Sequence, residues 1–268
     1  MTSRPPSHPA VRRRNAGALP LRVLGRAAGA AAAVLLLAAA GNAAAAPRTA
    51  AASGYDVSYP QCGRTLPRTP SFAIVGVSDG RPWYDNPCLA SEYTWAKTST
   101  SGRPVAFYMN TANPGTLSSH WGRPATPKTD CNPLMSDDFS CAYDYGWNAA
   151  AEAMAWTSSQ TGTASSQWWL DVETANSWSS NTASNAADLQ GSIDYLAQHG
   201  ATSVGVYSTA SQWNAITGSA PGFATTPNWV PGASSAKQAP TLCGASFTGG
   251  PVQLVQYPAG KFDGDIAC

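Results

Sequence analysis

The sequence has few charged residues: only 12% of its 268 residues are Asp, Glu, Lys or Arg. Six of the arginines and none of the acids precede Pro47, so the rest of the chain carries a net charge of −5. Just four lysines are present, and they are well separated, at Lys97, Lys128, Lys237 and Lys261. Nucleic acids and anionic lipids bind clustered cations, so neither is an expected partner.

Metal-ligand patterns are also missing. There is no Cys-x-x-Cys pair, and His120 and His199 are the only histidines after residue 46, so we expect no metal site. Aromatic and small residues are abundant instead, with 10 Trp, 10 Tyr and 24 Gly. Low charge combined with many aromatic rings is not the composition of an intrinsically disordered chain. The sequence therefore predicts a folded globular protein.

Residues 1–46 have the three zones of a secretory signal peptide. An Arg-bearing stretch runs to Arg26, an apolar run covers 27–40, and small residues fill 41–46. We predict cleavage near Ala46. The predicted product is a secreted protein, extracellular or in the cell wall, with no membrane attachment after cleavage.

Two alternatives remain open for this segment. Apolar and small residues continue over 27–46, so an uncleaved membrane span is the alternative to cleavage, although only Leu35, Leu36 and Leu37 form a strongly hydrophobic block. The Arg12–Arg14 run leaves both Sec and twin-Arg export open. Residues 47–53 are predicted to be a short linker.

All six cysteines follow the predicted cleavage site. An even number of cysteines in an oxidising compartment predicts three disulfides. Six cysteines allow fifteen connectivities. Proximity in the sequence favours Cys62 with Cys88, Cys131 with Cys141, and Cys243 with Cys268.

Residues 54–268 are predicted to form a single domain in which strands alternate with helices. The seven predicted strands are apolar runs at 55–58, 72–77, 105–109, 168–172, 203–207, 228–230 and 252–256. The predicted helices are 91–98, 149–156 and 186–199. Repeated βα units in a chain of this size predict an irregular (β/α) TIM-like barrel, with an open doubly wound sheet as the alternative. The Pro- and Ser-rich segment 113–143 is predicted to be a long loop at the barrel mouth.

The segment Leu170-Asp171-Val172-Glu173 ends one predicted strand. Because side chains alternate along a strand, Asp171 and Glu173 are expected to point to one side and Leu170 and Val172 to the other. Active sites of barrels lie at the carboxyl ends of the strands. A pair of carboxyl groups there is typical of glycoside hydrolysis, in which one group donates a proton and the other stabilises positive charge on the sugar. Incidental acids at a solvated strand end are the alternative.

Two more acids are expected near this pair. Asp56 lies within the first predicted strand, and Asp265 follows the last one. First and last strands are neighbours in a closed barrel, so both acids can face Glu173 across one mouth. Trp229, at another strand end, is expected to offer a flat face to a sugar ring.

A serine esterase is a competing hypothesis. Gly76-Val77-Ser78-Asp79-Gly80 matches the Gly-x-Ser-x-Gly pattern of a nucleophile elbow, and Asp171 with His199 would complete the triad order. An elbow requires a helix directly after the serine, and Arg81-Pro82 disfavours one.

Several motifs, taken in order, resemble the glycoside hydrolase family 25 muramidases. The opening strand Gly54-Tyr55-Asp56-Val57-Ser58 is similar to that of the family, Leu170-Asp171-Val172-Glu173 matches its Asp-x-Glu signature, and Val255-Gln256-Tyr257 with Asp265 is similar to its closing strand. The segment 113–143 and the six cysteines are additions to the family pattern. In place of the family's usual Ala-Thr-Glu-Gly after the second strand, the chain has Val77-Ser78-Asp79-Gly80.

The resemblance implies a secreted lysozyme that cleaves the β-1,4 bond between N-acetylmuramic acid and N-acetylglucosamine in peptidoglycan, as a monomer and without a cofactor. Glu173 would be the general acid and Asp171 would steady the substrate's acetamido group, while Asp56 and Asp265 complete the acidic floor. The residues expected to bind the substrate are Asp79, Tyr108, Asn110, Tyr207 and Trp229. A hydrolase-like barrel that binds glycan without cleaving it is the alternative.

Overall fold

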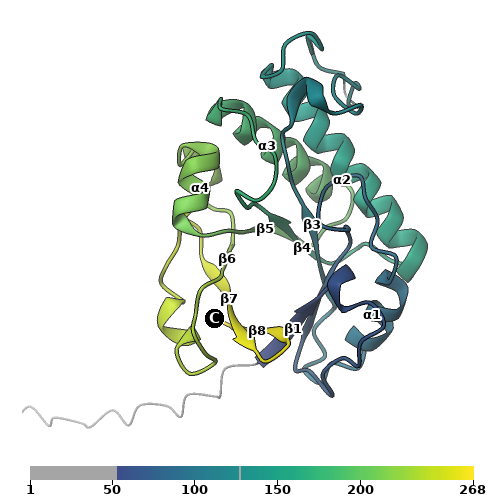
Figure 1. The fold of residues 1–268 in the computed structure, drawn as a ribbon, viewed down its shortest axis with the longest axis vertical. Helices are drawn as coiled ribbons and strands as arrows, with labels where there is room; N and C mark the ends of the chain where they lie inside the picture. Colours follow the sequence, from purple (N-terminus) through teal and green to yellow (C-terminus); the bar gives the residue numbers. More distant parts are fainter. Residues whose placement is uncertain (1–52, 127) are drawn as a thin grey trace, which may run out of the picture. The chain divides into compact units, whose positions relative to one another are not determined.

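The computed structural model describes residues 53–126 and 128–268, and in this part of the chain eight strands close into one ring (Figure 1). Strands β1 to β7 run parallel to one another, and each pairs with the next in chain order. The first seven are β1 (Ser53–Val57), β2 (Ala73–Gly76), β3 (Ala106–Asn110), β4 (Gln167–Asp171), β5 (Ser203–Tyr207), β6 (Asn228–Val230) and β7 (Val252–Ala259). The predicted α/β barrel is therefore confirmed, and the open sheet is excluded.

The strand that closes the ring was not predicted from the sequence. Strand β8 (Phe262–Ala267) forms a hairpin with β7 and runs antiparallel to both β7 and β1. We had placed Asp265 after the last strand, but it lies within β8, opposite Gly54 of β1. Two aspartates and a glycine disfavour a strand in this segment. Backbone pairing on both edges outweighs this local tendency.

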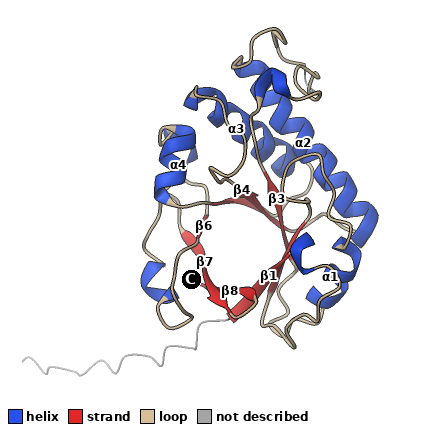
Figure 2. Ribbon diagram, in the orientation of Figure 1, coloured by secondary structure: helices blue, strands red, loops and turns tan. Residues whose placement is uncertain are grey.

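Four α-helices of the described residues cover part of the ring: α1 (Leu89–Ala96), α2 (Phe139–Thr161), α3 (Thr182–Gln198) and α4 (Ala210–Thr217). Figure 2 shows them on the outside of the ring, and it shows a short 3-10 helix, Ala239–Leu242, beside β7. Helix α2 starts earlier than predicted because the Asp138 side chain caps it, accepting a hydrogen bond from the backbone N of Cys141. The predicted loop therefore ends at residue 138, and α4 was not predicted.

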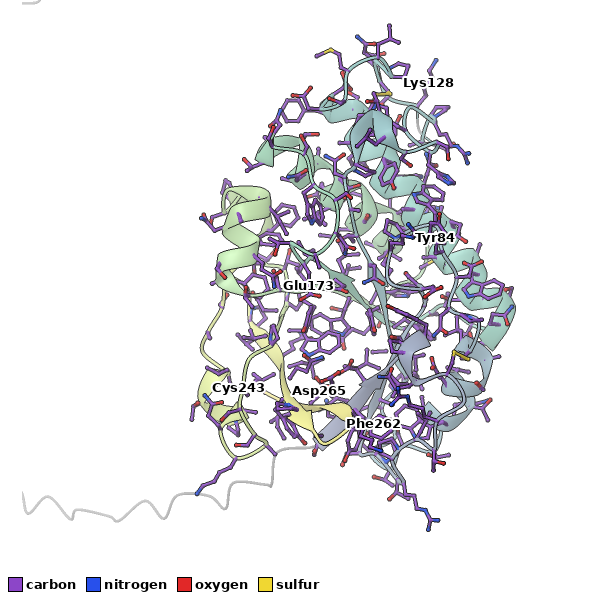
Figure 3. All side chains as sticks on the ribbon, in the orientation of Figure 1. Tyr84, Lys128, Glu173, Cys243, Phe262 and Asp265 are labelled. Atoms are coloured by element: carbon purple, nitrogen blue, oxygen red, sulfur yellow. A yellow bond between two sulfur atoms is a disulfide. The ribbon has the colours of Figure 1, made fainter. Side chains whose placement is uncertain are left out.

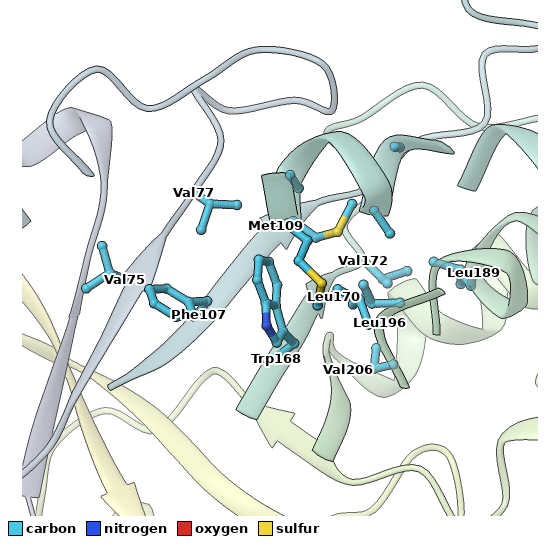
Figure 4. Packing of buried hydrophobic residues seen from close by; sticks show 14 of the residues in the cluster. Val75, Val77, Phe107, Met109, Trp168, Leu170, Val172, Leu189, Leu196 and Val206 are labelled. Carbon is cyan, nitrogen blue, oxygen red and sulfur yellow. The ribbon is translucent and has the colours of Figure 1, made fainter. Parts of the chain in front are cut away.

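The main core lies between the strands and the helices. Trp168, Leu170 and Val172 point outward into it and are fully buried, and they pack with helix residues such as Leu189 and Leu196 (Figure 4). A separate apolar cluster fills the inside of the ring, where its buried members are Phe72, Ile74, Ala106, Trp169, Trp229 and Leu254. Alternation along each strand thus supplies two cores from one sheet.

Two glycines allow α2 and α3 to cross closely. A Cβ on Gly146 of α2 would lie 1.9 Å from the carbonyl O of Asp188, and a Cβ on Gly191 of α3 would lie 2.1 Å from the carbonyl O of Tyr143. Any larger residue at either position would force the helices apart. The interface of these two helices therefore depends on having no side chain at its centre.

Three disulfides join Cys62 to Cys88, Cys131 to Cys141, and Cys243 to Cys268, the pairing that proximity favoured. No helix within the described ranges is both long and apolar enough to cross a bilayer. The predicted signal peptide, 1–46, and most of the predicted linker lie outside the described residues. Strand β1 begins at Ser53, one residue before the predicted domain start.

Candidate active site

Strand β4 delivers two acids to the inside of the barrel mouth. Leu170 and Val172 point into the outer core, whereas Asp171 and Glu173 both line a pocket of about 340 Å³. The two acids therefore lie on the same side of the strand, as the alternation of side chains along it predicted. Asp171 is 9% exposed, and Glu173, just past the strand end, is half-buried.

The pocket brings together side chains from β1, β3, β5, β6, β7 and β8 as well. Its lining consists of Asp56, Tyr108, Asp171, Glu173, Tyr207, Trp229, Gln256 and Asp263. Among the described residues, this lining includes four carboxyl groups and no lysine or arginine. In Figure 3, Glu173 and Asp265 both lie within the ring of strands as it is seen end-on. Asp265 is fully buried directly beneath the lining, against Asp56 and Trp229.

Asp56 and Asp265 form a hydrogen-bonded pair of carboxyl groups. A hydrogen bond between two carboxyl groups requires one proton, because two ionised carboxylates offer acceptors only. Burial raises the pKa of Asp56 to about 7, and the nearby Asp263 adds to this shift. Burial and the Asp56 charge also raise the pKa of Asp265 well above its usual range. The two groups together therefore hold a proton more tightly than a solvated carboxyl group does.

Neutral hydrogen-bond donors hold this pair in place from two sides. The Trp229 Nε1 donates to Asp265 Oδ1 at 2.8 Å, and the Gln256 Nε2 donates to Asp56 Oδ2 at 3.0 Å. The Tyr207 hydroxyl donates to Gln256 Oε1 at 2.9 Å, which fixes the orientation of that amide. The rings of Tyr207 and Trp229 meet edge to face, with centroids 4.8 Å apart. The floor of the pocket is therefore a connected network that contains no cation.

Asp171 is held by the strand beside it. Asn110 Nδ2, at the end of β3, donates to Asp171 Oδ2 at 2.5 Å, while Asp171 Oδ1 has no hydrogen-bond partner among the described residues. Burial raises the pKa of Asp171 well above its usual range, and the charges of Glu173 and Asp56 raise it further. The side chain therefore has one oxygen fixed and one left available.

Glu173 is supported from helix α4. Gln212 Nε2 lies 3.5 Å from Glu173 Oε1, and Gln212 Oε1 accepts from the backbone N of Thr174 at 2.7 Å. The Trp178 Nε1 donates to the backbone O of Glu173 at 2.8 Å. Neutral groups from two directions thus hold the segment after β4 in place, leaving the Glu173 carboxyl at the pocket surface.

Most of the predicted site residues meet in this region. Six of them line the pocket, namely Asp56, Asp171, Glu173, Tyr108, Tyr207 and Trp229. Asn110 lines a second hollow of about 270 Å³, which shares Asp56, Asp171, Glu173 and Tyr108 with the pocket. Three residues that we did not predict also take part, namely Gln256, Asp263 and Gln212. A glutamine carries no pattern of its own, and only its neighbours in the barrel reveal its role.

Two predicted roles do not fit the structure. Asp79 is exposed on the turn after β2 and is not among the residues that line either hollow. Trp229 is only 2% exposed, so its faces are covered and it serves as a hydrogen-bond donor in the floor rather than as a platform for a sugar ring.

The esterase triad is also not assembled. Ser78 is buried, and its Oγ accepts a hydrogen bond from the backbone N of Asn110. His199 lies exposed at the end of α3, stacked on Tyr195 with ring centroids 3.9 Å apart. The turn after Ser78 leads into an isolated bridge between Ser78 and Asp85 and not into a helix.

Away from the pocket, Cys131, Asp138 and Cys141 place metal-ligating atoms within 4.8 Å of one another. The two sulfur atoms are joined in a disulfide, so this group offers no thiolate for a metal.

The closed barrel with its acid-lined mouth has the kind of fold seen in solved lysozyme structures. A protein-family model described as "Lysozyme-like protein 1" matches residues 137–237, a range that contains Asp171 and Glu173. A search of curated proteins finds no match.

Among solved structures, the bacterial lysozyme of Streptomyces coelicolor is similar in fold, with a TM-score of 0.52 at 20% sequence identity, over 82% of this chain and 93% of that one. The modular autolysin LytC of Streptococcus pneumoniae has a TM-score of 0.51 at 16% identity, over 81% of this chain and 46% of LytC. The Cpl-1 endolysin, solved with a peptidoglycan analogue, has a TM-score of 0.50 at 16% identity, over 81% of this chain and 54% of its own. The resemblance to the family 25 muramidases is therefore confirmed at the level of the fold.

Proposed function

We propose that this protein is a secreted glycoside hydrolase that cleaves β-1,4 bonds of peptidoglycan, as an N-acetylmuramidase of the lysozyme type. The observation that carries the proposal is the meeting of Asp56, Asp171 and Glu173 in one open pocket without a cation in its described lining. Carboxyl groups with unequal surroundings, side by side at the mouth of a barrel, are what acid-catalysed glycoside cleavage requires. The lysozyme-like fold supports the same reaction.

Glu173 is the proposed general acid. It lies at the pocket surface, where the bridging oxygen of a bound glycan can reach it, and its neighbour Gln212 is uncharged. No lysine or arginine stands in the described lining to form an ion pair with this carboxyl group. After bond cleavage the same group would accept a proton from the attacking water.

Asp171 is the proposed partner of the substrate's acetamido group. Its Oδ2 is occupied by Asn110, and its Oδ1 is the oxygen that we assign to the N–H of the acetamido group. Held in this way, the acetamido carbonyl oxygen can approach the sugar carbon as the glycosidic bond breaks. Asp56 and Asp265, with one shared proton, keep the floor beneath the sugar partly negative, which stabilises positive charge developing on the ring.

The test is the release of reducing ends from purified peptidoglycan. We expect Glu173→Gln to lower the rate by roughly 100-fold or more, because the amide cannot donate a proton in the same way. The matched control is Asp130→Asn, which removes an exposed acid outside the cleft and should keep the wild-type rate. Both variants should unfold at the wild-type temperature.

Two results would count against the proposal. An unchanged rate in Glu173→Gln would remove Glu173 as the acid. If the wild-type protein released no reducing ends but was retained on insoluble peptidoglycan, a glycan-binding barrel without catalysis would be favoured.

Secretion is part of the same proposal. Residues 1–46 are proposed to be removed on export, and three disulfides suit an oxidising compartment. Sequencing the N-terminus of the exported protein should give a start at or near Pro47. Retention of residues 1–46 in the membrane fraction would support the anchor alternative.

A further inference from the structure

A third hollow extends the mouth away from the acids. It has a volume of about 470 Å³ and is formed by the turns that follow β2, β3 and β4. It shares Gly80, Ala175 and Asn176 with the 270 Å³ hollow, which in turn shares Asp56, Asp171 and Glu173 with the catalytic pocket. The three hollows are therefore consecutive parts of one cleft at the carboxyl ends of the strands. We call the third hollow the distal pocket.

The walls of the distal pocket are held by several cross-links. The turn after β2 is closed by a hydrogen bond from the backbone N of Asp79 to the O of Tyr84 at 2.8 Å. The Cys62–Cys88 disulfide lies just beyond this turn, and the Cys131–Cys141 disulfide ties down the segment after β3. Trp83, within the turn, has a φ of 69°, a conformation that is strained for a bulky residue and persists only where the surroundings impose it.

The chemistry of the distal pocket differs from that of the catalytic pocket. Its described lining contains no carboxyl group. Tyr84 is 48% exposed, and the guanidinium of Arg81 lies 3.7 Å from the centre of its ring. Trp83 stacks on His120 with centroids 3.9 Å apart. Hydroxyl and amide groups complete the surface, from Ser118, Ser119, Asn176 and Ser177.

Half-exposed aromatic rings beside hydroxyl, amide and guanidinium groups suit an uncharged sugar. The ring gives a surface for the apolar face of the sugar, and the polar groups bind its hydroxyl and acetamido oxygens. An acidic peptide is a poorer fit. Arg81 is already placed against Tyr84, and the same turn carries two acids, Asp79 and Asp85.

We propose that the distal pocket binds a further sugar unit of the glycan whose cleaved bond lies at Glu173. This inference rests on the proposed function for its substrate class. The site is built by the turn 79–85 and the segment after β3, so the cleft is longer than the acid-lined pocket requires. The protein consequently discriminates glycans by chain length, with long chains bound more tightly than short ones.

The first test compares short and long oligosaccharides of the same repeat as substrates. Loss of an aromatic contact of about 0.5–1.5 kcal/mol corresponds to a factor of about 2 to 12. We therefore expect Tyr84→Ala to lower the long-to-short ratio of kcat/KM by about 2- to 12-fold, mainly through KM. Tyr84→Phe should preserve most of the ratio. Leu134→Ala, a 90% exposed residue outside the cleft, is the matched control for removing an exposed side chain.

The second test does not require catalysis. Binding of the same oligosaccharides to the Glu173→Gln variant is measured by calorimetry, with and without Tyr84→Ala. Tighter binding of the long chain that disappears with Tyr84→Ala supports the distal pocket even if the wild type cleaves nothing. Equal affinity for both lengths, or an effect of Tyr84→Ala seen only with glycans that carry peptide branches, overturns the proposal.

Discussion

The two sides of the strand ring are packed by different rules. Outside, Trp168, Leu170 and Val172 face the helices in a dry apolar layer. Inside, the same strand, together with the turn that follows it, presents Trp169, Asp171 and Glu173, and acids replace apolar groups toward the mouth. The outer layer stabilises the fold, whereas the inner acids are costly to bury because desolvation disfavours their charged form.

The difference shows that the inside of the mouth is arranged for chemistry at a cost in stability. Asp56, Asp171 and Asp265 are all at least nine-tenths buried, and their hydrogen-bond partners are neutral donors or one another. Apolar side chains of similar size would avoid the desolvation of these groups. Changes outside the ring should therefore act on stability, and changes inside should act on activity or on its dependence on pH.

The largest expected effect is at the crossing of α2 and α3, outside the ring. Gly146→Ala would place a Cβ 1.9 Å from a backbone carbonyl oxygen, so we expect the free energy of unfolding to fall by about 3 kcal/mol in urea denaturation. Gly244→Ala is the matched control, because nothing lies within 4 Å of the added carbon. Equal stability of the two variants would contradict the close crossing.

An intermediate effect is expected inside the ring, at Asp171. Asp171→Asn should lower glycan cleavage by about 100-fold, since an amide replaces the carboxyl that steadies the substrate. The free energy of unfolding at neutral pH should stay the same or rise, because the asparagine carries no charge to desolvate. Asp130→Asn, at an exposed position, serves as the control for both measurements. A large loss of stability without loss of activity would reverse the contrast between the two sides.

The smallest effect concerns the dependence of stability on pH. The pKa of Asp56 is about 7 in the folded protein against a usual 3.8, so between these values the folded state binds more protons than the unfolded state. Stability is therefore greatest below the usual value and falls as pH rises through 7. We expect the melting temperature to drop by several degrees from pH 5 to pH 8. Asp56→Asn should flatten this slope, and an unchanged slope would remove Asp56 as its source.

The sequence predicted the fold where pattern and burial agree. The apolar runs of β2 and β4 are buried on both faces, so their composition alone identifies them as strands of a covered parallel sheet. Strand β8 could not be found in this way, because its Asp263-Gly264-Asp265 core is polar and only pairing with β1 and β7 makes it a strand. Helix α4 was not predicted because it has just eight residues. Its signal in the sequence was the pair of typical capping residues at its two ends, Thr209 and Gly218.

The site was predictable to the extent that it depends on strand alternation. The period of two placed Asp171 and Glu173 on one side, and ring closure brought Asp56 to them. Trp229 was misjudged because a tryptophan at a strand end can face either solvent or the interior, and burial decides between them. Gln256 and Gln212 became visible only through the atoms that they contact.

The antiparallel closing strand has a consequence for biosynthesis. Each of the other strands can add to its predecessor as the chain emerges, but β1 waits unpaired on one edge until β8, the last strand in chain order, has been made. Asp56 meets Asp265 only at that moment. A chain in which β8 has not yet paired with β1 therefore has no assembled pocket, and the site forms only with the closure of the ring.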